Sequence, residues 1–237
     1  TVNQDDGSCV FIPLKQNGML LKFTATWCEP CGNWGMGAFS DVYDANRGKI
    51  VAFTVQTNDD LMTSRNQPTF EAFKTRWDYT GTPNFVVNNT LLGTNYYDAQ
   101  SNINTITGQT PTIGTGVHWT IGGGANAGKI NINAYAKAFS GITGEYKMGV
   151  YIIAKKLYAY QNGQGDNYEH HKVMLGFAGS NPWGETITTS GATADEVFHL
   201  GYVVPLEANW NISELEVVTI LWKKVGASWD FVNATTN

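Results

Sequence analysis

Two cysteines at the end of a short apolar segment restrict the fold of this chain strongly. The segment, residues 19–35, reads MLLKFTATWCEPCGNWG, and its first eight residues are mostly the small, β-branched and apolar types that predict a buried strand. Pro30 stands between Cys28 and Cys31, and proline is tolerated in the first turn of a helix because the N–H that it lacks would have no intrahelical partner. We therefore expect a strand, a turn at Trp27 and a helix that begins at Cys28.

The expected helix start determines the chemistry of the two thiols. A thiol at a helix N-terminus faces unpaired N–H groups and the positive end of the helix dipole, and both stabilise thiolate over thiol. Cys28 is therefore the predicted nucleophile. Cys31, three residues later on the same face, is the predicted resolving thiol, which is more buried and closes a small disulfide ring. Such a dithiol needs no cofactor, and we expect none.

Other uses of the two cysteines need to be compared with this one. A zinc site needs two further ligands, and Cys9 is the remaining cysteine, which we expect to be a small buried side chain. The histidines lack the spacing of zinc ligands, so we predict no metal site; they are His118, His170, His171 and His199. A purely structural bridge between Cys28 and Cys31 stays open as an alternative.

Composition sets the broad class of the protein. The 237 residues are 42% hydrophobic and 13% aromatic, which suffices for two modest domains with real cores. The net charge of −5 and the lack of a basic run argue against nucleic-acid binding. No apolar stretch approaches the length of a transmembrane helix. Few cysteines and only 15% charged residues favour an exported protein, and the start at Thr1 suggests that a leader or tag has been removed.

The first half of the chain predicts alternating strands and helices. Beyond the dithiol, helical spacing of apolar residues and short buried runs give the order β-α-β-α-β-β-α. The predicted helices are residues 33–46, 69–77 and 96–106, and the predicted strands after the first are residues 49–56, 85–88 and 91–92.

A second motif supports a redox function. Residues 79–87 read YTGTPNFVV, and together with the string TWCEPC at residues 26–31 they resemble the thioredoxin superfamily, above all its extracytoplasmic reductases. The resemblance implies a cis-proline at Pro83 opposite the dithiol, with the backbone of Thr82 pairing with a client chain. For a single X-Pro bond considered alone, trans is the commoner state. Trp27, next to the thiol, would line the client groove.

Three residues are expected to tune the dithiol. Thioredoxins carry a buried aspartate six residues before the first cysteine, where this chain has Lys22, and their usual lysine partner aligns near Thr54. A charged Lys22 would favour thiolates, burial would push it toward the neutral form, and a side chain that reached solvent would have no effect. Glu29 places a carboxylate beside Cys28 and disfavours its thiolate. Pro30, between the thiols, is the third tuning residue.

The second half changes to a period of two. A Thr-, Gly- and Pro-rich stretch predicts a linker at residues 110–116, between a thioredoxin-like α/β domain at 1–109 and a domain at 117–237. Beyond the linker, alternating strands with Gly- and Asn-rich turns predict an all-β, immunoglobulin-like sandwich. The expected inward faces are Ile130, Ile132, Ala134, Ala136 and Ala138; Met148, Val150, Ile152 and Ala154; and Val217, Thr219 and Leu221.

Aromatic and imidazole side chains in this half permit a binding site of their own. Five tryptophans could form a platform for stacking sugars, although core packing is the usual role of tryptophan in a sandwich; they are Trp119, Trp183, Trp210, Trp222 and Trp229. His170 and His171 are adjacent, so on a strand they point to opposite faces and do not share a metal.

The second half also carries a family resemblance. Residues 146–160, 168–177, 183–185 and 210–224 resemble the β-sandwich half of the outer-membrane-protein-twenty-eight group of Gram-negative envelope proteins, which join a thioredoxin-like module to an immunoglobulin-like sandwich. The resemblance implies a place outside the cytoplasm, in the periplasm or associated with the outer membrane. It also implies association with the outer membrane or with other envelope proteins.

Together these observations predict an extracytoplasmic thiol–disulfide oxidoreductase that leans toward reduction. Its partners would be a client protein with a disulfide and an upstream electron donor. The alternative is a non-enzymatic envelope binding or adhesion protein, in which the thioredoxin-like half is a scaffold with an inert bridge.

Overall fold

The computed structural model describes residues 12–237, so the expectation for Cys9 lies outside the described residues. The helices are the π-helical turn Cys31–Gly35, α1 (Met36–Ala45), α2 (Gln67–Arg76) and α3 (Ala99–Thr107), with short 3₁₀ turns at Tyr96–Asp98, Gly124–Asn126 and Ile212–Glu214. The strands are β1 (Gly18–Thr24), β2 (Ile50–Gln56), β3 (Asn84–Val87), β4 (Thr90–Gly93), β5 (Ile113–Ile121), β6 (Lys129–Ala138), β7 (Ile142–Thr143), β8 (Tyr146–Gln161), β9 (Gly165–Ala178), β10 (Glu185–Thr188), β11 (Gly191–Ala192), β12 (Val197–Pro205), β13 (Leu215–Val225) and β14 (Ser228–Thr236).

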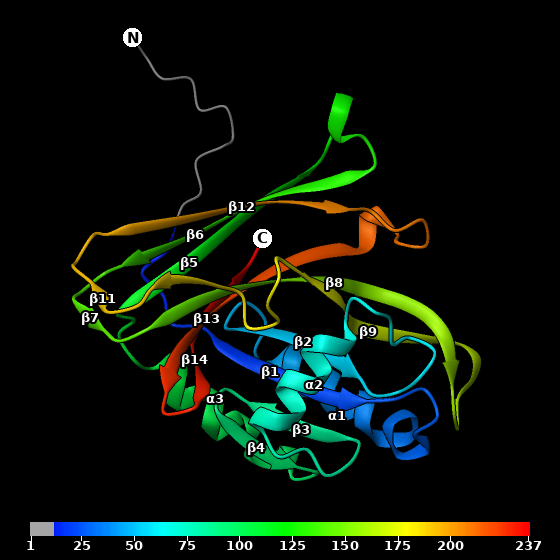
Figure 1. Cartoon of the computed structure of the whole chain (residues 1–237). Helices are drawn as coiled ribbons and strands as arrows, with labels where there is room; N and C mark the ends of the chain where they lie inside the picture. The colour runs from blue at the N-terminus through cyan, green and yellow to red at the C-terminus, as the bar shows by residue number, and fades with distance from the viewer. Residues whose placement is uncertain (1–11) are drawn as a thin grey trace.

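The chain is a mixed α/β protein, and its predicted order of elements in the first half is confirmed. The described residues form three sheets. The largest has nine strands, eight of them in the order β14-β13-β8-β9-β2-β1-β3-β4, while β10 pairs with β8 outside this order. β12, β6 and β5 form a second sheet, and β7 pairs with β11. The nine-stranded sheet joins the two halves of the sequence, because β9 lies beside β2 in parallel at Thr54 and Val173 (Figure 1).

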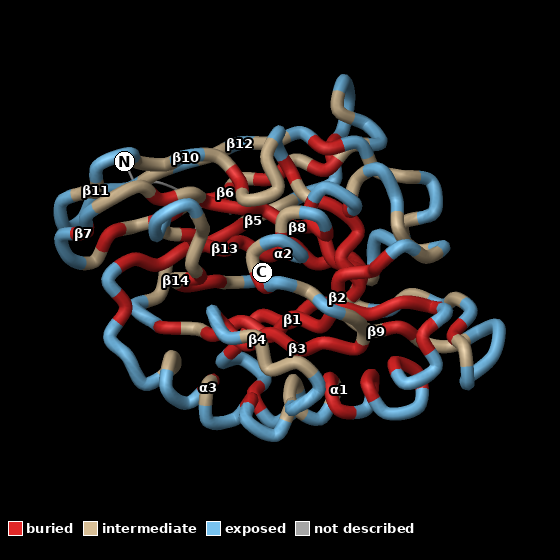
Figure 2. The backbone as a smooth tube through the Cα atoms, turned by 60° about the horizontal axis from the view of Figure 1, so that its bottom comes forward, coloured by how far each residue is buried: buried red, intermediate tan, exposed pale blue. Residues whose placement is uncertain are grey.

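The first half of the large sheet is covered on both faces. Every residue of β1 and β2 is buried, as expected for strands with helices on both sides. On one face α1 and α3 pack through Phe39 and Ile103, while on the other face α2 packs through Phe70 and Phe73. Figure 2 shows the buried strands running between the layer of α1 and α3 and the strands of the second half.

The second half consists of two facing sheets. The sheet of β5, β6 and β12 packs on β8, β9 and β13, and the core between them contains 20 buried residues. β6 alternates strictly between half-buried and buried residues, so its predicted inward face is confirmed. The expected inward residues of β8 and β13 are buried as well.

The predicted linker needs correction. β5 begins at Ile113, inside the predicted residues 110–116, and both Ile113 and Thr115 are buried. In the sequence, Gly114 was interpreted as part of a flexible segment. In the structure, its lack of a side chain leaves room for Phe139, because a Cβ on Gly114 would lie 2.7 Å from that ring. The small residues of this stretch therefore allow close packing, and the chain passes directly into β5 of the three-stranded sheet.

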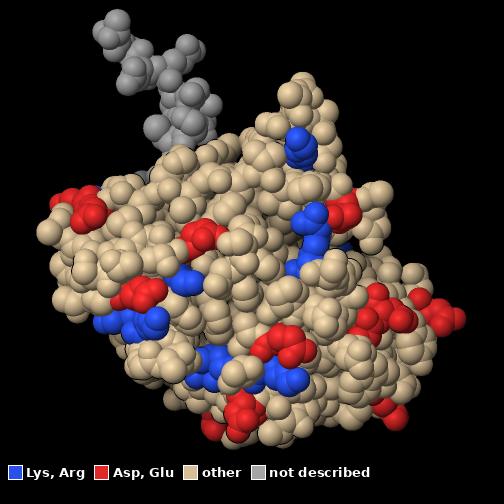
Figure 3. Space-filling view, viewed as in Figure 1, with Lys and Arg blue, Asp and Glu red and all other residues tan. Residues whose placement is uncertain are grey.

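Charged groups are sparse on the surface. Figure 3 shows a face on which most side chains are uncharged and several of the acidic groups lie beside basic ones. One such pair, Arg76 and Asp230 at 2.7 Å, connects α2 to β14. Among residues 12–237 there is no helix with the length and apolar character needed to cross a bilayer.

Candidate redox site

The site begins where β1 ends and the chain turns into a helix. The N–H of Cys28 donates to the carbonyl of Ala25 at 3.2 Å, which closes the turn. Pro30 has helical dihedral angles, φ −58° and ψ −30°, as its position in a first helical turn requires. The helix then differs from the expected regular α-helix, because a π-helical turn over Cys31–Gly35 precedes α1. Such turns often occur at functional sites.

Cys28 and Cys31 are joined by a disulfide, with their Cα atoms 5.2 Å apart. The backbone N–H of Cys31 donates to Sγ of Cys28 at 3.1 Å. Cys28 is 3% exposed and Cys31 is fully buried. The donor is therefore aimed at the more exposed sulfur, where it would stabilise a Cys28 thiolate after reduction.

Thr82 and Pro83 face the disulfide from the start of β3. The bond between them is cis, the isomer that the resemblance to thioredoxins implies. The carbonyl oxygen of Thr82 lies 3.5 Å from Sγ of Cys28, and its hydroxyl oxygen lies 3.2 Å from Sγ of Cys31. The same hydroxyl donates to the carbonyl of Phe23 at 2.7 Å. Thr82 thus touches both sulfurs from one side.

Trp27 is 53% exposed beside Cys28. Its indole N–H donates to the carbonyl of Asn58 at 3.0 Å. In the same loop, the carboxylate of Asp59 accepts from the N–H of Thr26 at 2.8 Å, and burial raises the pKa of this carboxyl. The loop that follows β2 therefore holds the chain just before the dithiol. Sequence reasoning missed Asp59, because a lone acidic residue in a loop carries no motif.

Lys22 is fully buried, so the alternative in which its side chain reaches solvent is wrong. Its ammonium nitrogen contacts the sulfur of Met36 and lies 5.7 Å from the centre of the Phe39 ring. Burial lowers the pKa of Lys22 from 10.5 to about 7. Thr54 is its direct neighbour on β2, as the alignment to thioredoxins placed it.

The other two tuning residues lie at the surface. Glu29 and Pro30 are exposed, and the amide of Asn33 donates to Glu29 at 3.4 Å. One helical turn on, Trp34 stacks on Phe85 with ring centres 6.2 Å apart.

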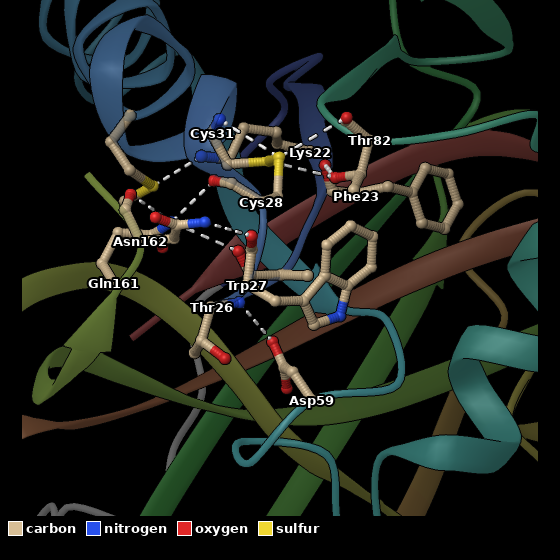
Figure 4. The surroundings of a disulfide bond; sticks show 12 residues. Lys22, Phe23, Thr26, Trp27, Cys28, Cys31, Asp59, Thr82, Gln161 and Asn162 are labelled. Atoms are coloured by element: carbon tan, nitrogen blue, oxygen red, sulfur yellow. Dashed lines mark hydrogen bonds between the residues drawn. A yellow bond between two sulfur atoms is a disulfide. The ribbon is translucent and has the colours of Figure 1, made fainter. Parts of the chain in front are cut away.

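The tip of the β8–β9 hairpin is a part of the site that sequence reasoning missed. Gln161 donates from its side-chain amide to the carbonyl of Cys28 at 2.8 Å and to that of Ala25 at 3.4 Å. Asn162 donates from its backbone N–H to the carbonyl of Thr26 at 2.7 Å and from its side chain to that of Trp27 at 3.0 Å. Figure 4 shows the disulfide between this tip on one side and Thr82 on the other. The sequence showed a turn here, but no local signal tells where a hairpin tip lies in space.

The tryptophans of the second half do not form one platform. Trp183 and Trp222 pack against each other with ring centres 4.9 Å apart, next to Phe73 in a buried cluster. Trp210 lies elsewhere, with its ring under the guanidinium of Arg65 at 5.8 Å. Because Trp222 is fully buried and Trp210 lies apart, the five indoles do not form a single exposed platform.

The two adjacent histidines have different surroundings, as expected for neighbours on a strand. His170 is 1% exposed and its pKa is lowered, mainly by burial. His171 is partly exposed and lies 3.1 Å from the carboxylate of Glu169.

Comparisons with known proteins cover different parts of the chain. The family model of outer membrane protein Omp28 matches residues 70–233. The solved structure of HBP35 of Porphyromonas gingivalis is similar with a TM-score of 0.77 and 19% sequence identity, over 95% of this chain and 76% of that one. At this identity the likeness concerns the fold alone. The solved structure of a domain of the outer membrane lipoprotein Omp28 from Porphyromonas gingivalis matches 53% of this chain and 86% of the chain of that domain. The sequence identity is 11% and the TM-score is 0.34. No curated protein matches.

Proposed function

This chain belongs to the family of outer membrane protein Omp28, and on that premise we propose that it is a thiol–disulfide oxidoreductase which reduces disulfides in client proteins. As a member of that family it is a protein of the cell envelope, outside the cytoplasm, in the periplasm or associated with the outer membrane. The reaction belongs to the Cys28–Cys31 dithiol, with Thr82 as the residue along which a client chain would lie.

We assign a thioredoxin-like fold to the first half and an immunoglobulin-like sandwich to the second. The order of β1, α1, β2, α2, β3, β4 and α3, with β1 between β2 and β3 in the sheet, supports the first assignment. The two facing sheets of the second half support the other. The likeness in fold to HBP35 over 95% of this chain supports treating the two parts as one arrangement.

The first step is an attack by the Cys28 thiolate on one sulfur of a client disulfide. A bond forms between Sγ of Cys28 and that sulfur, the client disulfide breaks, and the other client sulfur leaves as a thiolate that takes a proton from solvent. The N–H of Cys31, 3.1 Å from Sγ of Cys28, would stabilise the attacking thiolate.

The second step releases the client. Cys31 loses its proton and attacks Sγ of Cys28, so the mixed disulfide breaks, the Cys28–Cys31 disulfide forms, and the second client sulfur leaves as a thiolate that takes up a proton. The client has then gained two electrons and the protein has lost two. An upstream dithiol donor would restore the reduced form, itself becoming a disulfide. Before its deprotonation, the Cys31 thiol can donate to the hydroxyl oxygen of Thr82, 3.2 Å away.

One observation carries this proposal: the two sulfurs have different partners. Cys28 has a backbone N–H donor, which favours its thiolate, while Cys31 faces a hydroxyl oxygen whose own proton is directed at Phe23. Such asymmetry suits a nucleophile and a resolving thiol. A disulfide with a purely structural role does not require different hydrogen-bond partners at its two sulfurs.

The reduction potential of the pair tests the proposal. Titration against dithiothreitol or glutathione, read by alkylation, should give a value near that of thioredoxin, about −270 mV, for a reductase. A value near about −120 mV would instead make the protein an oxidant. In addition, Cys31→Ser should trap a client as a mixed disulfide, whereas Cys28→Ser should be inactive and trap nothing.

A second candidate is favoured by the burial of both cysteines. With Cys28 only 3% exposed, an inert bridge in a non-enzymatic envelope binding or adhesion protein would also fit. Structural disulfides typically have potentials below about −300 mV. The non-enzymatic binding protein would be favoured if the reduction potential of the bridge lay in that range and neither cysteine variant differed from wild type in turnover or trapping.

A further inference from the structure

The tip of the β8–β9 hairpin binds the backbone of the segment that leads into the dithiol. Four consecutive carbonyls, those of residues 25–28, each accept a hydrogen bond from Gln161 or Asn162. The two donor residues lie more than 130 positions further along the chain, so this contact comes from the second half of the sequence. Together they hold the turn at which β1 ends and the helix begins.

We propose that Gln161 is a positioning residue for Cys28: it holds the carbonyls of Ala25 and Cys28 and so fixes the turn that aims the N–H of Cys31 at the Cys28 sulfur. This inference deepens the proposed function, because it assigns a residue from the second half of the chain to the same dithiol.

The burial of Gln161 supports a role beyond packing. The side chain is fully buried, and its amide oxygen has no hydrogen-bond partner among the described residues. Leaving a buried polar atom unpaired costs free energy, so an apolar side chain of the same size would pack there more favourably. The amide donors are what an apolar residue could not supply, and both point at carbonyls of the dithiol turn.

The close fit of the tip restricts how Gln161 can move. A Cβ on Gly32 would lie 2.8 Å from the carbonyl oxygen of Asn162, so the helix start and the tip meet without an intervening side chain. Gly163 has φ +84°, and a Cβ there would lie 2.7 Å from the amide oxygen of Asn33. Gln161 is also paired with Gly165 at the end of the hairpin ladder. The backbone that carries Gln161 is therefore held close to the start of the helix.

The chemical consequence follows from the hydrogen bond to Cys28. Cys31 donates to the Cys28 sulfur across the same turn whose first and last carbonyls Gln161 holds. If those carbonyls were released, the turn could relax and the donor would move away from the sulfur. The thiolate would then be less stable and the pKa of Cys28 would rise.

The test uses the reduced full-length chain with Cys9→Ser and Cys31→Ser, so that Cys28 is its one thiol and the backbone N–H at position 31 remains. The pH dependence of alkylation by iodoacetamide gives the pKa of Cys28. Gln161→Met keeps the length of the side chain and removes the donors, and we expect alkylation near neutral pH to slow by about threefold to tenfold. Gln164→Ala is the matched control, because Gln164 belongs to the same tip but donates to Asn33, at 3.4 Å. It should stay within about twofold of the parent.

Two outcomes would overturn the inference. One is a Gln161→Met variant with a lower melting temperature and an unchanged Cys28 pKa, which would mean packing alone. The other is an equal shift in Gln164→Ala, which would mean a general loosening of the tip. If Gln161→Met does not fold, Gln161→Leu takes its place: it also removes both donors, and a raised Cys28 pKa supports the inference while an unchanged one overturns it. No client is needed, so a protein without reductase activity still gives a readable result.

Discussion

Lys22 and Thr54 lie directly opposite each other on the parallel strands β1 and β2, and both are buried. In this position a lysine has no carboxylate to pair with among the contacts of its ammonium group, which are the sulfur of Met36 and the ring of Phe39. At any pH at which Lys22 is charged in the unfolded chain, its burial therefore lowers the free energy of unfolding.

The first prediction concerns this lysine and pH. The pKa of Lys22 is 10.5 in the unfolded reference and about 7 in the folded protein, so between these values the unfolded chain binds a proton that the folded protein does not. Stability should therefore rise with pH in this window, by at most about 1.4 kcal/mol per pH unit. Lys22→Met should remove this slope and stabilise the protein near pH 7 by on the order of a few kcal/mol. Urea unfolding at several pH values measures both, and an identical slope in the variant would contradict the assignment.

A second prediction concerns the hydroxyl of Thr82. Thr82→Val keeps the shape of the side chain but leaves the carbonyl of Phe23 without its donor and Cys31 without its oxygen neighbour. We expect a loss of about 1–2 kcal/mol in stability and a faster second step, seen as less mixed disulfide with a peptide client, because the acceptor that stabilises the neutral Cys31 thiol is lost. Thr82→Ser keeps the hydroxyl and should behave like wild type. Equal accumulation of mixed disulfide in both variants would show that the hydroxyl has no part in release.

The third prediction compares two glycines in the helix that carries the dithiol. A Cβ on Gly35 would lie 3.2 Å and 3.3 Å from ring atoms of Pro83, so Gly35→Ala should displace the Thr82 loop and cost about 1–3 kcal/mol in stability, with lower turnover of a peptide disulfide. A Cβ on Gly37 would meet no atom of the described residues within 4 Å. Gly37→Ala should therefore gain up to about 1 kcal/mol from helix propensity and keep its turnover. Thermal unfolding and a turnover assay on both variants test this difference in stability and turnover. Equal results for the two variants would mean that Pro83 does not pack against Gly35.

The fourth prediction is independent of redox chemistry. The hydroxyl of Tyr151 donates to the carbonyl of Pro182 at 2.8 Å and accepts from the indole N–H of Trp222 at 3.0 Å, in a fully buried position. Tyr151→Phe leaves both partners unpaired, and we expect a loss of about 2–4 kcal/mol in the free energy of unfolding. Tyr158→Phe, at an exposed tyrosine, serves as control. A loss below about 0.5 kcal/mol for Tyr151→Phe would mean that the two groups find other partners.

Local patterns in the sequence predicted local structure well. The strand before Cys28, the helix with Phe70 and Phe73 on one face and the alternation of β6 all follow from the spacing of apolar residues, which reports which side of an element is buried. From the sequence, Gly35 could be interpreted only as a residue of low helix propensity. The structural reason for a glycine at this position is the close approach of Pro83, which lies far along the chain.

Contacts between distant segments could not be predicted in this way. The prediction of a linker at 110–116 was wrong because small residues occur at close packing contacts as well as in flexible segments. Gly114 lies at such a packing contact, with Phe139. Gln161 and Asn162 looked like ordinary turn residues, because their partners are backbone carbonyls that have no signature in the sequence. The same limit applied to Lys22, whose burial depends on Met36 and Phe39 above it.

The position of β9 beside β2 places a strand of the second half in the sheet of the first half. A fragment that ended at residue 109 would keep β2 but lose its neighbour, leaving an apolar strand with a free row of backbone donors and acceptors. Such an edge pairs with other chains, so this fragment should aggregate. The family match begins at residue 70, within α2, so it contains β9 but neither β2 nor the dithiol. The strand that lies beside β2 is thus encoded more than a hundred residues later, and the sheet of the dithiol half is complete only when both halves of the chain are present.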